Sequence, residues 1–135
     1  MALQFSVAVR NARLDSVETT VGASAVLQIR TGSAPANCAA ASTGTVLATL
    51  NLPADWMAVA SAGSKTLLGS WQDAAADATG TAGYFRIFDT TVTTCHIQGT
   101  VTITGGGGDM ELDNTSIATG QQVTVTAFTL TDGNA

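Results

Sequence analysis

The fold is decided by residues 80–104, GTAGYFRIFDTTVTTCHIQGTVTIT. Apolar and polar residues alternate on either side of a turn near Asp89, and a period of two is typical of β-strands with one buried face. Phe85 and Ile87 are expected on one face, with Tyr84, Arg86 and Phe88 on the other. After the turn the inward set continues with Cys95, Ile97, Gly99, Val101 and Ile103. The stretch therefore predicts two adjacent strands of an antiparallel sheet, which the rest of the chain extends or covers.

The same patterning predicts further short strands at residues 25–30, 45–52, 67–72, 110–112 and 121–131. In the last of these, Val123 and Val125 share a face, whereas Phe128 and Leu130 have the opposite parity. Such a phase change predicts a β-bulge or a bend from one sheet to another. About seven or eight strands with turn signals between them predict a mainly β protein, an antiparallel β-sandwich of the jelly-roll type, with an open barrel as the second choice. We expect residues 23–135 to form this sandwich domain.

One N-terminal helix is predicted within the segment 1–22. Ser6 can cap its start, Gly22 can end it in the left-handed conformation, and the apolar positions at helical spacing are Val7, Leu14, Val17 and Val21. Its polar side would carry Arg10, Arg13, Asp15 and Glu18. The alternative is a short strand in which Phe5, Val7 and Val9 alternate. Such a helix either covers one face of the sheet or reaches onto a neighbouring subunit.

Two loop features bear on packing. Residues 32–44, GSAPANCAAASTG, form a long loop, and a loop of this length in a small domain usually has a function or packs on a partner. Trp56 follows the strand-ending Pro53, and we expect its ring to seal the edge of the core, with exposure at an interface as the alternative. The glycine run 105–108 is expected to be a flexible connection.

The composition excludes several classes of protein. The 135 residues fit one domain, and the ten acidic residues outnumber five scattered basic ones, so nucleic acid is not an expected partner. No run of about 18 apolar residues predicts a transmembrane helix, and the N-terminus does not resemble a secretory signal. Synthesis in the cytoplasm is expected. Cys38 and Cys95 are therefore predicted to be free thiols, which could form a bond after release into oxidising surroundings.

The sequence predicts no enzyme. His96 is the only histidine, and Cys95 would point to the opposite face of the same strand, so the two cannot act together. Asp109, Glu111 and Asp113 alternate and could offer carboxylates to Ca²⁺, but position 120, where a calcium loop needs a glutamate, is a glycine. The glycine run lacks the Lys-Ser/Thr of a phosphate loop. No catalytic, cofactor-binding or metal-binding residue is assigned.

Four stretches carry a resemblance: ARLDSVETTVGASAVLQIRTG (12–32), GTAGYFRIFD (80–89), TCHIQGTV (94–101) and DMELDNTSIATGQQVTVTAFTLT (109–131). Together they resemble a group of small structural proteins of tailed bacteriophages. The resemblance implies a non-enzymatic virion protein, either a capsid decoration (cement) protein or a tail or neck structural protein, including a receptor-facing β module. A carbohydrate-binding or hydrolytic protein is the remaining hypothesis, and it lacks clustered aromatic residues and carboxylates in the sequence.

For the decoration protein, the resemblance implies a position on the outer capsid surface of a virion made in a bacterial host. Its partner would be the major capsid protein, and it would be a homo-oligomer, a trimer or a dimer. Many weak contacts on a symmetric lattice reinforce one another through effective concentration. The segment 1–22 and the loop 31–43 are the candidate arms that would lie on neighbours, and packing on their own sheet is the alternative. Deleting residues 1–22 is then expected to abolish attachment and to leave the sandwich folded.

Overall fold

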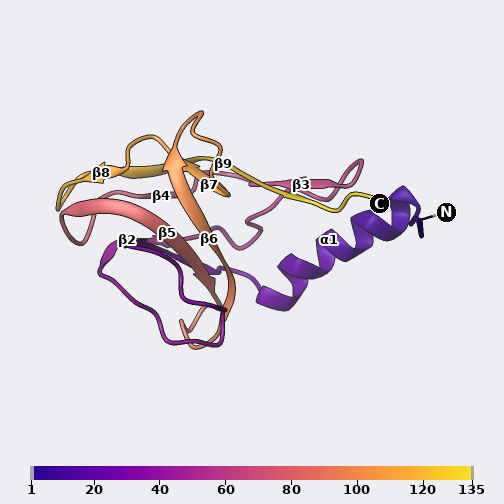
Figure 1. The fold of residues 1–135 in the computed structure, drawn as a ribbon, viewed down its shortest axis with the longest axis horizontal. Coiled ribbons are helices and arrows are strands. Elements are labelled where there is room, and N and C mark those ends of the chain that lie inside the picture. Colours follow the sequence, from indigo (N-terminus) through magenta and orange to yellow (C-terminus); the bar gives the residue numbers. More distant parts are fainter. Residues whose placement is uncertain (1, 135) are drawn as a thin grey trace.

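The computed structural model describes residues 2–134, and within them the chain forms one helix and nine strands (Figure 1). Met1 and Ala135, the outermost residues of the predicted segments 1–22 and 23–135, lie outside the described residues. The elements are α1 (Val7–Val21), β1 (Val26–Thr31), β2 (Val46–Asn51), β3 (Ser64–Thr66), β4 (Gln72–Asp73), β5 (Gly80–Phe88), β6 (Cys95–Ile103), β7 (Met110–Leu112), β8 (Ser116–Ile117) and β9 (Val123–Thr131).

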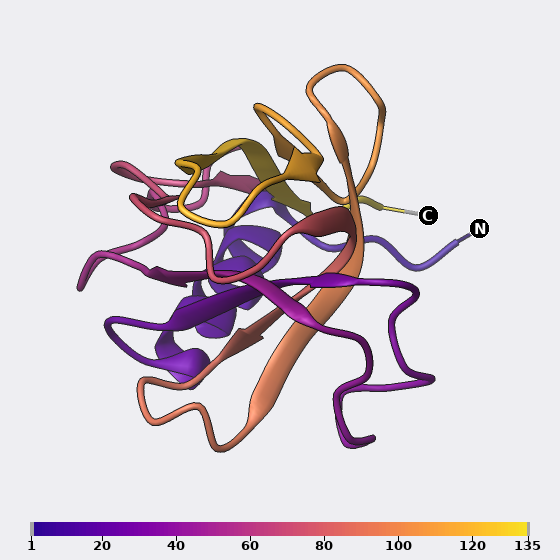
Figure 2. The same ribbon diagram turned by 90° about the vertical axis from the view of Figure 1, so that its left-hand side faces the viewer.

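The strands form one curled sheet in the order β2-β1-β5-β6-β7-β9-β3, while β4 pairs with β9 and β8 with β5 (Figures 1 and 2). All these pairs are antiparallel except β6 with β7, which is parallel. The predicted mainly β class with one N-terminal helix is confirmed. The pairing path is that of a mixed sheet, and it does not confirm the jelly-roll sandwich.

The predicted central pair is confirmed, because β5 and β6 are antiparallel neighbours with Phe85 opposite Gly99. The expectation that one face of each strand is exposed to solvent is wrong for β5. Phe85 and Ile87 are buried on one face, and Tyr84, Arg86 and Phe88 are buried on the other. The cause is the 32–44 loop, which lies over the second face of the strand and is described below. Ile103, expected inward, is 52% exposed.

A register shift in the central pair changes the side to which Cys95 points. Ile87 is opposite Ile97, but Phe88 is opposite Cys95, so His96 is the extra residue of a bulge. Because a bulge inserts one residue, the side chains before it change face. Cys95 therefore lies on the Arg86 side of the sheet and not, as predicted, on the side of Ile97.

The glycine run lies in the loop that connects the parallel strands β6 and β7. Gly105 and Gly107 have φ of +85° and +80°, a region that favours glycine. A Cβ added at Gly108 would stand 2.8 Å from the methyl group of Thr102, and Gly108 N donates to Thr102 Oγ1 at 3.0 Å. The predicted connection is present, and the hydrogen bond from Gly108 to Thr102 holds it against β6.

The phase change predicted in the last strand is confirmed as a β-bulge. Leu112 is opposite Val125 and Glu111 opposite Ala127, so Thr126 is the extra residue. Val123, Val125 and Phe128 are consequently all buried despite their different parity. The bulge lets one strand contribute to the core along its whole length.

The predicted strand 67–72 is wrong. Its place is taken by β3, which ends at Thr66, and β4, which begins at Gln72, with Gly69 at φ +75° between them. The intervening residues are positioned by Trp71, which is buried and whose indole donates to the Trp56 carbonyl at 3.0 Å. Trp56 is also fully buried, so its predicted role in sealing the core is confirmed.

Helix α1 has the predicted start but only part of the predicted apolar face. Ser6 accepts a hydrogen bond from Val9 N at 3.2 Å as the N-cap. Leu14 and Val21 are buried, but Val7 is exposed, because the N-terminal turns project past the sheet (Figure 1). Gly22 ends the helix with φ 96° and ψ 172°, a positive φ as expected but not the left-handed helical conformation.

Candidate interaction surface

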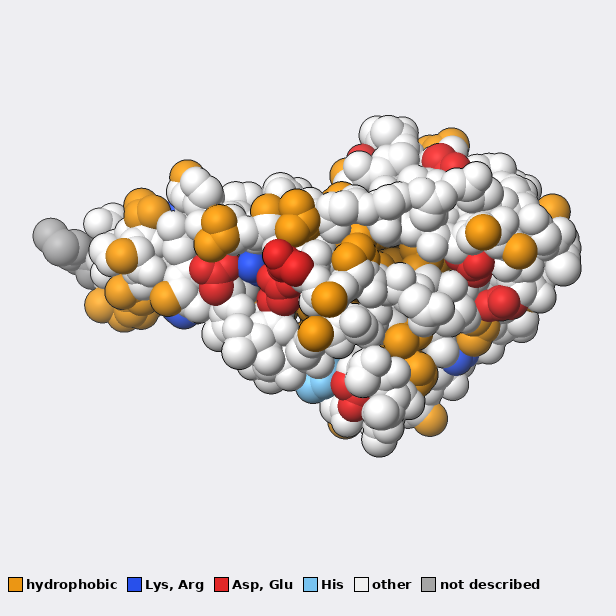
Figure 3. All heavy atoms as spheres, turned by 180° about the vertical axis from the view of Figure 1, so that it is seen from behind, with side chains coloured by type: hydrophobic (Ala, Val, Ile, Leu, Met, Phe, Trp, Pro, Cys, Tyr) orange, Lys and Arg blue, Asp and Glu red, His pale blue; other side chains and the backbone are white. Residues whose placement is uncertain are grey.

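The projecting end of the molecule carries four exposed large apolar side chains, here together called the apolar tip: Leu3, Phe5, Val7 and Val9. Their exposed fractions are 76%, 40%, 46% and 42%. Figure 3 shows hydrophobic side chains gathered at this end of the molecule. A cluster of large apolar side chains in water is typical of a binding surface, because single exposed hydrophobic residues are common and groups of them are not.

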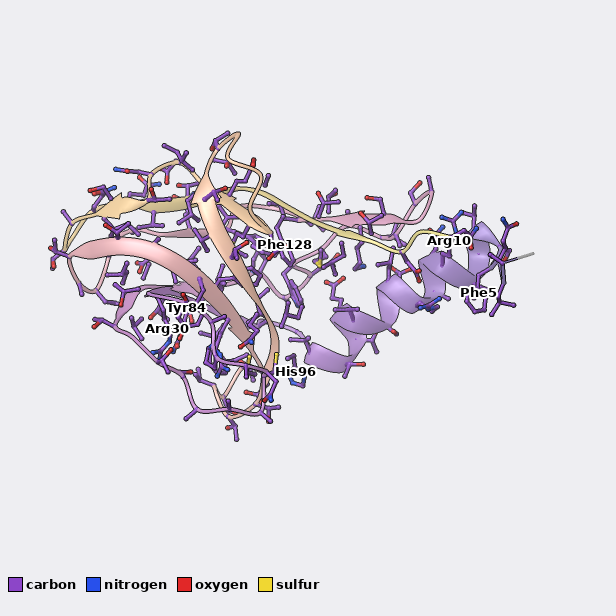
Figure 4. The ribbon with its side chains drawn as sticks, viewed as in Figure 1. Phe5, Arg10, Arg30, Tyr84, His96 and Phe128 are labelled. Atoms are coloured by element: carbon purple, nitrogen blue, oxygen red, sulfur yellow. The ribbon has the colours of Figure 1, made fainter. Side chains whose placement is uncertain are left out.

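The apolar tip is held in a fixed position by the end of the chain. Phe5 N donates to Asn134 Oδ1 at 2.8 Å, and Asn134 Nδ2 donates to the Phe5 carbonyl at 3.0 Å. The Arg13 guanidinium lies 5.0 Å from the centre of the Phe5 ring and forms a 3.1 Å ion pair with Asp132. Figure 4 labels Phe5 and Arg10 at this end, where Arg10 donates to the Asp132 carbonyl. The tip is thus organised before any partner binds, which lowers the entropy cost of binding.

The helix behind the tip is fastened to the sheet by one buried lysine. Lys65 of β3 is 2% exposed, and its ammonium nitrogen lies 2.7 Å from Asp15 Oδ1 and 3.0 Å from Glu18 Oε2. It also donates to the Ala58 carbonyl at 3.0 Å. Asp15 and Glu18 were predicted on the polar side of the helix, and the structure turns them toward the sheet. A buried charge needs such partners, so this contact fixes the angle of the helix.

These contacts shift the pKa values of the three groups. The hydrogen bond from Lys65, with one from Ala60 N, lowers the pKa of Asp15. Burial alone would raise the pKa of Glu18 and lower that of Lys65. Hydrogen bonds from Lys65 and from Met57 N outweigh burial at Glu18, so the Glu18 pKa is lowered. Hydrogen bonds to Asp15 and Glu18 outweigh burial at Lys65, so the Lys65 pKa is raised. The neighbouring Glu18 carboxylate, which a protonated Asp55 can hydrogen-bond, raises the pKa of Asp55.

The 32–44 loop, part of the second predicted arm, packs on its own sheet. Arg86 Nη2 donates to the Asn37 carbonyl at 3.0 Å, and Arg86 Nη1 donates to Ser42 Oγ at 3.1 Å. Gln98 Nε2 donates to the Pro35 carbonyl at 2.7 Å. The Tyr84 hydroxyl accepts from Thr43 N at 3.0 Å. Of the two predicted arms, only the N-terminal one presents a group of large apolar side chains to solvent.

The acidic residues that sequence patterning singled out are held apart by separate backbone contacts. Asp109 Oδ2 accepts from Thr100 N at 2.9 Å, Glu111 Oε2 from Gly107 N at 3.2 Å, and Asp113 Oδ1 from Thr124 N at 3.1 Å. Among residues 2–134, no three His, Cys, Asp or Glu side chains lie together as metal ligands. Each carboxylate therefore has a local structural role.

His96 lies apart from these carboxylates. It lines a hollow of about 240 Å³ with residues of α1, among them Ser16 and Thr20. A larger hollow of about 490 Å³ between β6 and β9 has an apolar floor that includes Phe85 and Phe128, with Asp109 and Glu111 among its lining residues. These two carboxylates already accept the backbone hydrogen bonds described above.

In the described part of the chain no helix is long and apolar enough to cross a membrane.

Comparisons of this chain with protein-family models, with curated proteins and with solved structures gave no match. Sequence reasoning placed Val7 on a buried helix face and so missed the apolar tip. The alternation of Phe5, Val7 and Val9, which suggested a strand, was the available signal. In the structure these side chains are exposed around the first turn of α1.

Proposed function

We propose that the protein is a non-enzymatic structural component of a tailed-bacteriophage virion, a decoration protein on the outer capsid surface. In this proposal the apolar tip binds the major capsid protein and the curled sheet faces outward. The observation that carries the proposal is the exposed, preorganised tip of Leu3, Phe5, Val7 and Val9 at the end of a helix fastened to the body. The sequence resemblance supplies the class of partner.

The charge of the chain supports a position away from the packaged genome. Five basic residues oppose ten acidic ones, and of the basic five, Lys65 and Arg86 are buried. A protein with so few exposed cations has little affinity for phosphate backbones. Copies bound side by side on a capsid lattice, as dimers or trimers, would reinforce weak single contacts.

The test is sedimentation of undecorated capsids with the purified protein, followed by quantification of the bound copies. A decoration protein saturates at hundreds of copies per particle, whereas a tail or neck ring holds about a dozen. The double variant Leu3→Ser and Phe5→Ser is expected to bind at least about tenfold more weakly, because it removes two of the four side chains of the apolar tip.

The matched control is Ile103→Ser, an equally exposed apolar residue at the C-terminal end of β6, far from the N-terminal segment (Figure 1). This variant is expected to bind like the unaltered protein. An absence of capsid binding, with binding to purified tails instead, would move the protein to a tail or neck position. Equal weakening by the tip and control variants would contradict the role of the tip.

A further inference from the structure

The fold brings the two cysteines of the chain to the same side of the sheet. The bulge at His96 turns Cys95 to the side of Arg86, which the 32–44 loop covers. Arg86 Nη2 donates to the carbonyl of Asn37, the residue before Cys38. The middle of the covering loop is thereby held over the same side of the sheet as Cys95. The loop thus brings Cys38 to the side of the sheet on which Cys95 lies.

The two thiols are free and half-buried. Cys38 directly follows Asn37, which Arg86 holds, and Cys95 lies on the same side of the sheet as Arg86. Burial, together with the adjacent Cys38 thiol, raises the pKa of Cys95 to about 11. Cys95 is therefore protonated at neutral pH and is not a general reactive thiol. Its Sγ instead faces the Ile97 carbonyl at 3.5 Å.

We propose that Cys38 and Cys95 are the site of a reversible intramolecular disulfide that fastens the 32–44 loop to β6. The loop is already positioned by Arg86 and Gln98, which lie opposite each other on β5 and β6 and donate to the carbonyls of Asn37 and Pro35. The folded protein thus presents the thiols to each other before oxidation. The bond adds a covalent link to a loop that is otherwise held by hydrogen bonds to neutral acceptors.

The oxidant is a low-molecular-weight disulfide of the glutathione type. The Cys38 thiolate attacks one of its sulfurs, the sulfur–sulfur bond breaks, and one small thiolate leaves with the electron pair and takes up a proton. The Cys95 thiol then loses its proton to solvent and attacks the Cys38 sulfur of the mixed disulfide. The second small thiolate leaves, so two protein thiols are oxidised and one small disulfide is reduced to two thiols. In a reducing cytoplasm the reverse exchange keeps both cysteines as thiols.

The experiment incubates the folded full-length protein with oxidised glutathione and follows it by intact mass and non-reducing peptide mapping. The expected product is a monomer lighter by two hydrogen atoms, with the peptides of Cys38 and Cys95 joined. Its melting temperature is expected to rise by roughly 10 °C, and protease cleavage within residues 32–44 is expected to slow. Added dithiothreitol should reverse all three changes.

The variants Cys38→Ser and Cys95→Ser are the matched controls, each with one thiol. Cys38→Ser is expected to react slowly with glutathione, because the remaining thiol is the protonated Cys95, whereas Cys95→Ser is expected to keep a mixed disulfide. The proposal is overturned if the unaltered protein keeps glutathione on either cysteine or forms only dimers between chains. The bond is a property of the single chain, so failure of capsid binding leaves this result unaffected.

Discussion

The ammonium nitrogen of Lys65 in β3 lies 2.7 Å from Oδ1 of Asp15 in α1. Asp15 also accepts from Ala60 N at 2.9 Å, so one carboxylate joins the helix to both a buried cation and the loop before β3. Glu18, one helical turn later, repeats this arrangement by accepting from the backbone N–H groups of Trp56 and Met57. The orientation of the helix therefore depends on polar contacts as much as on Leu14 and Val21.

We expect Lys65→Ala to lower the free energy of unfolding by about 3 kcal/mol, because Asp15, Glu18 and the Ala58 carbonyl lose their shared donor. Urea unfolding measures this loss. The matched control combines Lys65→Met, Asp15→Asn and Glu18→Gln, which removes the charges together and keeps similar side-chain volumes. This triple variant is expected to lose less than the single one. Equal losses would mean that the ion pairs contribute little.

Acid is expected to weaken the same junction. The pKa values of Asp15 and Glu18 are lowered in the folded protein, so their contribution is complete at neutral pH and is lost as the pH falls through about 4 and below. The raised pKa of Lys65 gives a contribution that is complete below about pH 10 and is lost above it. The raised pKa of Asp55 acts in the opposite sense to its neighbours, favouring the folded state as the pH falls.

Thermal unfolding between about pH 7 and pH 3 tests this expectation. The melting temperature should fall on acidification, and the double variant Asp15→Asn and Glu18→Gln should show a shallower fall. Asp55→Asn should instead steepen the fall slightly, since it removes a carboxyl group whose protonation favours folding. A double variant as acid-sensitive as the unaltered protein would place the sensitivity elsewhere.

Two glycines offer a contrasting pair of substitutions. A Cβ at Gly83 would stand 1.9 Å from the Gly32 carbonyl oxygen, so Gly83→Ala must push the 32–44 loop away from β5. We expect a loss of about 3 kcal/mol and faster protease cleavage in the loop. Gly22→Ala meets nothing within 4 Å and only strains a positive φ, so about 1 kcal/mol is expected. Chemical denaturation ranks the two, and a smaller effect at Gly83 would contradict the close packing of the loop.

The contacts of the helix change the result expected from deleting residues 1–22. The deletion takes Leu14 and Val21 from the core and leaves the buried Lys65 without its carboxylates. It also removes the Gly22 carbonyl, which accepts from the Trp56 indole at 2.9 Å. We therefore expect an aggregated or unfolded product by circular dichroism and gel filtration. Deleting residues 1–5 keeps the Ser6 cap and should leave the protein folded, so a folded product of the longer deletion would make the helix a separable arm.

Local pattern was sufficient for the central part of the fold. Alternation located β5 and β6, and the parity change between Val125 and Phe128 located the bulge in β9. These features depend on neighbours along the chain, which a sequence displays directly. The predicted capping of α1 by Ser6 has the same origin.

Contacts between distant segments could not be predicted in this way. The second buried face of β5 depends on Arg86 binding Asn37 and Ser42 in a polar, small-residue loop. The bulge at His96, which redirects Cys95, leaves no mark in the alternation after the turn. The apolar tip also escaped prediction, because Val7 fits the helical spacing of the core residues and yet lies beyond the end of the sheet.

The pairing of Phe5 with Asn134 gives the molecule a mechanical axis. A pull on the apolar tip is transmitted through Asn134 and Asp132 into β9, which is hydrogen-bonded to β3, β4 and β7 along its length. Figure 1 shows that β9 runs toward the tip, so the load is parallel to the strand and strains many hydrogen bonds at once. Resistance to such a load is set by the rate of unfolding. A partner that binds the tip and pulls on it would therefore stretch the molecule along a strand that is hydrogen-bonded to three neighbours.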